Sequence, residues 1–149
     1  MGLDLTIYEL KNYDPNNVQK KFDIEEVMYL SNGNAMLLVN WLYRNDEAKL
    51  TGGYLKLSNI YHEIYGYLFK EVLENLKTVL NAPVEKRDTL ALFYFPCLYT
   101  VGDWISNVEM FSEYYYRDLE YLHEQLGRLL KGYNAKHPDD RLFFYNISW

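Results

Sequence analysis

The sequence predicts an α+β fold in which about three helices pack on one face of a small, mainly antiparallel sheet that contains both terminal strands. Leu3, Leu5 and Ile7 alternate with polar residues at the start of the chain, and the apolar segment 141–149 closes it. Between these ends, apolar residues recur at steps of three or four, which is the period of one helix face. The 149 residues, 49% of them hydrophobic, fit a single domain with an adequate core.

The opening alternation predicts a short, half-buried strand, and the turn-rich residues 12–17 end it. We interpret residues 22–46 as one helix that is capped by Asp23. Gly33 lies inside this segment, where a glycine costs about 1 kcal/mol relative to alanine. The alternative is therefore a helix that begins only after Ser31.

Residues 54–57 are expected to form a second short strand, followed by a helix over residues 58–80. Pro83 ends this helix, because the residue before a proline avoids the helical conformation. Residues 84–88 are interpreted as a solvated linker, and the apolar run 89–99 as a buried extended segment that ends near its proline. The buried face of the helix is predicted from apolar residues at steps of four: Ile64, Leu68, Val72, Leu76 and Leu80.

The best-defined element is a helix over residues 106–132. Ser106 and Glu109 have the spacing of a capping box, in which each side chain satisfies a backbone N–H at the start of the helix. Gly132 can adopt the left-handed conformation that ends a helix. A continuous apolar stripe runs between these signals: Phe111, Tyr115, Leu119, Leu122, Leu126, Leu129 and Tyr133.

Charge and composition exclude several classes of function. The net charge is −6 and the basic residues are dispersed, so direct binding to nucleic acid is not expected. No apolar run approaches the ~18 residues of a membrane span, and the acidic Asp4 near the start argues against a signal peptide. Cys97 is the single cysteine, which excludes an internal disulfide, and we interpret it as a small buried hydrophobe.

The sequence contains no recognisable catalytic or metal-binding set. His62-Glu63 and His123-Glu124 each begin the zinc motif H-E-x-x-H, but a glycine stands in place of the second histidine in both. We therefore expect no metal, no cofactor and no enzymatic activity. Four carboxylates could in principle pair for acid–base chemistry, and a solvated surface is the default interpretation for them: Asp4, Asp103, Asp118 and Glu120.

The chain opens MGLDLTIYEL and closes FFYNISW. These two ends resemble those of a family of small phage and prophage proteins, which open MGLDMYL and close on an aromatic-rich strand ending Ser-Trp. Residues 26–42 resemble the first helix of that family, residues 54–58 its strand-to-helix junction and residues 115–121 its last helix. The resemblance implies a viral accessory protein in the cytoplasm of a bacterial host cell, and it implies no mechanism.

Sixteen tyrosines are the main anomaly of composition, and an aromatic-rich core and surface in a chain biased towards Lys, Asn and Tyr is the default interpretation. The alternative is a recognition surface, because tyrosine offers a large contact area with a polar tip. Together with the small size, the mild acidity and the lack of a catalytic set, this predicts a protein-binding surface that acts on a host factor, for instance a defence nuclease. Self-association of the same surface stays open, and the alternative function is a small-ligand protein that stacks a nucleotide signal on its aromatic rings. Tyr116 and Arg117 are expected to face solvent. The interface candidates are Trp104, Tyr114, Tyr116, Arg117 and Tyr121.

Overall fold

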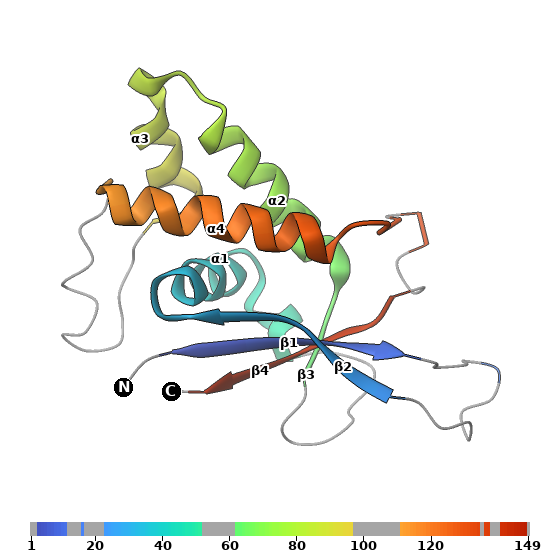
Figure 1. The fold of residues 1–149 in the computed structure, drawn as a ribbon. Coiled ribbons are helices and arrows are strands. Elements are labelled where there is room, and N and C mark those ends of the chain that lie inside the picture. Colours follow the sequence, from blue (N-terminus) through green and yellow to red (C-terminus); the bar gives the residue numbers. More distant parts are fainter. Residues whose placement is uncertain are drawn as a thin grey trace.

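The computed structural model of this chain describes residues 3–11, 16, 23–51, 62–96, 111–134, 136–137 and 141–148. The strands are β1 (Asp4–Lys11), β2 (Asp23–Ser31), β3 (His62–Ile64) and β4 (Phe143–Ser148), and the helices are α1 (Asn32–Thr51), α2 (Gly66–Leu80), α3 (Val84–Tyr94) and α4 (Glu113–Leu129). The strands form one antiparallel sheet in the order β2-β1-β4-β3, with the helices on one face of it (Figure 1). The α+β class is confirmed, with four helices in the described residues where about three were expected.

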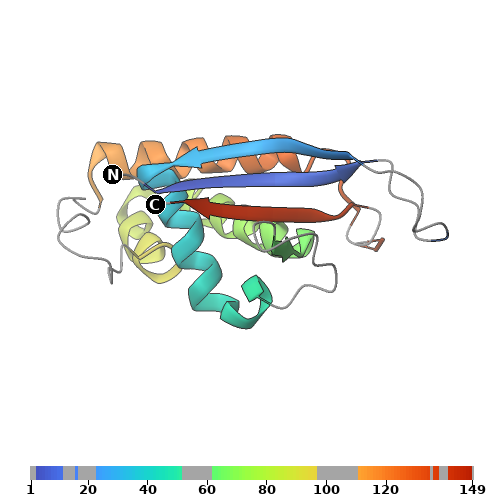
Figure 2. The ribbon, with the colours of Figure 1, turned by 90° about the horizontal axis from the view of Figure 1, so that it is seen from below.

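The sheet contains the first and last strands, as expected, and these two lie side by side at its centre (Figure 2). Leu5 is opposite Ile147 and Ile7 is opposite Tyr145 in the antiparallel register of β1 and β4. Leu5 and Ile7 are almost fully buried, because alternate residues of a strand face the helical layer. The main hydrophobic core therefore lies between this sheet and α1, α2 and α4.

The expectation of one helix over residues 22–46 is wrong, and the alternative of a helix that begins after Ser31 is confirmed. Residues before that point form β2, in which buried Met28 and Leu30 lie on either side of exposed Tyr29. Asn32 has a positive φ of 53°, and the Asn34 side chain accepts a hydrogen bond of 3.0 Å from the Ser31 backbone N–H. This turn separates the strand from the helix, so the spacing that looked helical belongs to two elements.

The helix expected over residues 58–80 is shorter, because α2 begins only at Gly66 and Ile64 belongs to β3. A Cβ atom on Gly66 would lie 2.8 Å from the Tyr133 ring and 3.0 Å from the Phe143 ring. Glycine therefore allows the start of α2 to approach these two rings. The helix ends at Leu80, as predicted, and the expected strand 54–57 lies outside the described residues.

The linker expected at residues 84–88 and the extended segment expected at 89–99 are wrong up to Tyr94, because these residues form α3. Pro83 precedes the helix, where its missing N–H costs nothing, and its carbonyl accepts bonds from the N–H groups of Lys86 and Arg87. Only Ala91 is fully buried on this helix, whereas Leu92 and Phe93 are exposed. Because apolar residues also lie on the solvent side of α3, the apolar residues of this segment do not show helical spacing in the sequence.

The helix expected at 106–132 is confirmed in its central part, over Glu113–Leu129. Its cap is Ser112, whose side chain accepts a hydrogen bond of 3.2 Å from the Tyr115 N–H, and the expected capping pair at residues 106 and 109 lies outside the described residues. Phe111 has a positive φ of 68°, so it precedes the helix instead of starting its stripe. Gly132 has a φ of 80°, in the left-handed region as predicted. The buried stripe is Tyr115, Leu119, Leu122, Leu126 and Leu129.

Candidate interaction surface

Two consecutive tyrosines of α4 fix the position of α3. Tyr115 is buried, and its hydroxyl donates a hydrogen bond of 2.7 Å to the carbonyl of Phe95, just beyond the end of α3. The Tyr116 hydroxyl donates to the carboxylate of Asp88 in α3, and the Arg87 guanidinium lies 5.1 Å above the Tyr116 ring. The expectation that Tyr116 faces solvent is therefore wrong, because this side chain is half-buried between the two helices.

The environment of Tyr116 keeps its hydroxyl protonated. Burial, the hydrogen bond to Asp88 and the charge of that carboxylate all raise the pKa of Tyr116, and the nearby charge of Arg87 only partly opposes them. The hydroxyl therefore remains a hydrogen-bond donor across the physiological pH range. Its role here is to hold α3 against α4.

Three of the predicted interface residues do lie at the surface of α4. Tyr114 is 74% exposed, Tyr121 is 41% exposed and the Arg117 side chain is also exposed. Arg117 donates to Glu113 at 2.5 Å, and its guanidinium lies 5.7 Å above the Tyr114 ring. The structure therefore brings these residues together on one side of the helix, whereas Trp104 lies outside the described residues.

A second exposed apolar group lies on α3, and sequence reasoning missed it. Leu92 is 54% exposed and Phe93 is 61% exposed. Arg44 of α1 donates a hydrogen bond of 2.6 Å to the Phe93 carbonyl, and its guanidinium lies 5.9 Å above the Phe93 ring. We call Arg44, Leu92 and Phe93 the α3 patch. The sequence signal for this group was the dense apolar run 89–99, which we assigned to the interior.

A groove of about 420 Å³ is the feature that bears on the small-ligand alternative. Tyr67 offers an aromatic ring there, but Glu71 and Glu74 supply two carboxylates against the single amine of Lys70. A phosphate-bearing ligand would meet net negative charge, so the groove does not suit a nucleotide. The lining residues come from α1 and α2: Trp41, Tyr67, Lys70, Glu71, Glu74 and Asn75.

Two of the carboxylates considered for acid–base chemistry, Asp4 and Asp118, have hydrogen-bond partners in the structure. Asp4 accepts a hydrogen bond of 2.6 Å from the Tyr29 hydroxyl. Burial raises the pKa of Asp118, and a side-chain hydrogen bond with Asn34 partly opposes this increase. Glu120 is exposed, and Asp103 and Cys97 lie outside the described residues.

No group of three potential metal ligands occurs in the part of the chain that the structure describes. The helices of that part include none with the length and apolar character needed to cross a membrane.

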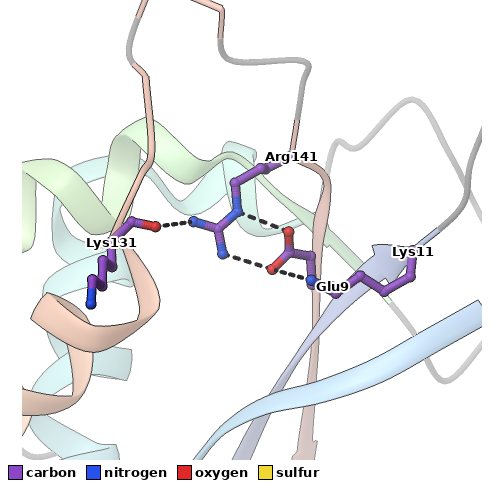
Figure 3. Close-up of polar contacts among 4 residues, drawn as sticks. All are labelled: Glu9, Lys11, Lys131 and Arg141. Atoms are coloured by element: carbon purple, nitrogen blue, oxygen red, sulfur yellow. Dashed lines mark hydrogen bonds and ion pairs between the residues drawn. The ribbon is translucent and has the colours of Figure 1, made fainter.

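A buried electrostatic contact that was not predicted lies near the C-terminal end of α4. The Glu9 carboxylate of β1 accepts two hydrogen bonds from Arg141, at 2.8 and 2.7 Å, and Lys11 lies 3.4 Å away (Figure 3). Arg141 also donates to the carbonyl of Lys131, just past α4, at 3.4 Å. Glu9 and Arg141 are 132 positions apart, so no local pattern could link them. Because the Glu9 carboxylate is fully engaged, this cluster connects β1, α4 and the entry to β4.

Comparison of the chain with protein-family models, curated proteins and solved structures gives no match. The arguments below therefore rest on the geometry of this molecule.

Proposed function

We propose that this protein is a non-catalytic accessory protein of a phage or prophage, which binds a host protein stoichiometrically in the bacterial cytoplasm. The target class that we propose is a component of a host defence system, such as a nuclease. The observation that carries the proposal is the distribution of exposed apolar side chains. In the described residues these lie mainly on or beside α3 and α4, with Tyr29 as the exception: Val84, Leu92, Phe93, Phe111, Tyr114 and Tyr121.

The α3 patch has the composition of a binding anchor. Burying an exposed leucine or phenylalanine side chain contributes about 1.5–3 kcal/mol, so Leu92 and Phe93 together could supply a substantial part of a binding free energy. Arg44 beside them adds a cation and hydrogen-bond donors, and arginine and aromatic residues are enriched among the residues that dominate interfaces. The rigid contacts of Tyr115 and Tyr116 hold α3 in place, which limits the entropy lost on binding.

The experiment is a titration of the protein into a host nuclease assay. We expect inhibition that saturates near one equivalent, because each copy would occupy one target. The variant Leu92→Ser/Phe93→Ser should weaken inhibition by tenfold or more while its melting temperature stays close to that of the wild type. Val84→Ser is the matched control, since it removes an exposed apolar side chain from the other end of α3.

Loss of the host activity at strongly substoichiometric amounts would mean turnover and would refute the proposal. Unchanged inhibition by Leu92→Ser/Phe93→Ser would remove the α3 patch as the binding surface.

A further inference from the structure

The side of α4 that faces away from the core carries an ordered set of charges. Glu113 and Arg117 form an ion pair of 2.5 Å one helical turn apart, and Glu124 and Arg128 form a second pair of 2.5 Å. All four side chains are more than half exposed. We call this side, with its tyrosines, the outer face of α4; its residues are Glu113, Tyr114, Arg117, Glu120, Tyr121, Glu124 and Arg128.

The positions of these charges are symmetric along the helix. Glu113 and Arg128 are equally far from the midpoint between residues 120 and 121, and so are Arg117 and Glu124. At each pair of symmetric positions one residue is acidic and the other is basic. A second helix of the same sequence, laid antiparallel across that midpoint, would therefore present the opposite charge at each of these four positions.

We propose that the outer face of α4 binds the same face of a second copy of this chain, with a two-fold axis between residues 120 and 121. In this register Glu113 faces Arg128 of the second copy and Arg117 faces its Glu124, and each contact occurs twice by symmetry. The two ion pairs within each helix remain in this arrangement. Acidic and basic side chains therefore alternate at both ends of the contact between the two helices. A parallel arrangement would place Glu113 against Glu113 and Arg117 against Arg117, so the charges select the antiparallel one.

The aromatic residues of this face support the same arrangement. Tyr121 lies next to the axis, where its ring can stack on Tyr121 of the second copy. Tyr114 faces Gly127 of the second copy, and the neighbouring Arg128 of that copy can place its guanidinium over the Tyr114 ring. A Cβ atom on Gly127 would have nothing within 4 Å, so this position leaves room for an approaching helix. Figure 2 shows α4 along the side of the molecule next to β2, where a second copy can reach it.

The contact should be weak and sensitive to salt. Exposed ion pairs each contribute little free energy and are screened as the ionic strength rises. Glu120 lies beside the axis on the side away from Tyr121, so its carboxylate would approach Glu120 of the second copy. Neutralising Glu120 should therefore strengthen the dimer.

The test uses two charge reversals that each preserve the pair within the helix. One variant is Glu113→Arg/Arg117→Glu and the other is Glu124→Arg/Arg128→Glu. Each variant alone would place like charges opposite each other at both ends, and sedimentation equilibrium at low salt should show association weakened by at least tenfold. An equimolar mixture of the two variants restores every opposite-charge contact and should associate, as should the variant that carries all four changes.

Glu74→Lys/Lys77→Glu is the matched control, because it reverses an exposed pair of 3.6 Å on α2 and should leave association unchanged. Glu120→Gln should lower the dissociation constant, and high salt should raise it. A wild-type protein that stays monomeric at low salt and high concentration would overturn the proposal. So would reversed variants that fail to associate when mixed, provided that each melts like the wild type. None of these outcomes involves the α3 patch, so they do not depend on whether a host protein binds there.

Discussion

Replacing Arg141 by methionine tests the contact between Arg141, just before β4, and Glu9 of β1. The substitution removes the guanidinium but keeps an unbranched stem near the Phe143 ring, above which the guanidinium lies at 5.0 Å. The Glu9 carboxylate would then lose both of its hydrogen bonds from Arg141. We expect Arg141→Met to destabilise the protein because it leaves a buried charge without its main partner.

The magnitude follows from how far each side chain is buried. The Glu9 side chain is 5% exposed and the Arg141 side chain is 22% exposed. Removing one partner of a fully buried ion pair costs about 3–5 kcal/mol. Lys11 remains 3.4 Å from the same carboxylate and Arg141 is partly hydrated, so we expect a loss of about 2–3 kcal/mol. For a protein of this size that loss corresponds to a decrease of about 1–2 M in the urea midpoint.

The loss should depend on pH, with a sign that follows from Glu9. Burial acts to raise the pKa of Glu9, but the hydrogen bonds and charge of Arg141, together with Lys11, outweigh it and hold the pKa below its ordinary value of 4.5. Between these two pKa values the unfolded chain binds a proton that the folded chain does not. The stabilisation is therefore fully present above pH 4.5 and is lost as the pH falls through the lower pKa of the folded state.

Urea titrations of the wild type and Arg141→Met, at pH 7 and in steps below pH 4.5, measure both effects. The difference between the two proteins should be largest at pH 7 and should shrink in acid. Lys11→Met is the matched control, since the Lys11 side chain is 40% exposed and the loss of its amine should cost less than about 1 kcal/mol. An Arg141→Met protein with the wild-type midpoint at pH 7, or a difference that does not change with pH, would refute this account.

Three further changes test other contacts by the same unfolding measurements. Tyr116→Phe removes the hydrogen bond to Asp88 and should lower the free energy of unfolding by about 0.5–1.5 kcal/mol, with a smaller loss when Asp88→Ala is already present. Gly33→Ala would bring a methyl group against the Asp118 carboxylate and should destabilise the protein, whereas in an Asp118→Ala background it should stabilise by up to about 1 kcal/mol through helix propensity. Equal effects in both backgrounds would contradict this contact. Removing residues 147–149 deletes the end of β4 and should cost about 2–5 kcal/mol, and a truncated protein that melts like the full chain would be evidence against it.

The elements that the sequence predicts well are those whose burial follows a simple period. β1 and β4 alternate or are densely apolar, and the buried stripe of α4 has helical spacing along its whole length. β2 was missed because Val27 and Leu30 are three residues apart, as on a helix, although Val27 is only half-buried. α3 was missed because Leu92 and Phe93 are apolar but exposed. An analysis of apolar spacing assigns such residues to the interior.

The contacts that hold the molecule together were less predictable, because they join residues that are distant in sequence. Nothing near Glu9 indicates Arg141, and nothing near Tyr116 indicates Asp88, which lies 28 positions away. Tyr114, Arg117 and Tyr121 could be placed at the surface because helical spacing alone puts them off the buried stripe. The same reasoning failed for Tyr116, because an unrecognised helix packs against that side of α4.

The two sides of α4 are under different physical constraints. Its buried stripe must be apolar for the core to form, and that requirement determines five of its positions. Its exposed charges contribute less than about 1 kcal/mol per pair, so folding alone would accept them in almost any order. The observed order pairs Glu113 with Arg117 and Glu124 with Arg128 along the helix, and it also matches opposite charges at these four positions across one midpoint. Folding accounts for the first property but does not require the second, so the charge-reversal mixture is the experiment that tests whether the second property reflects binding.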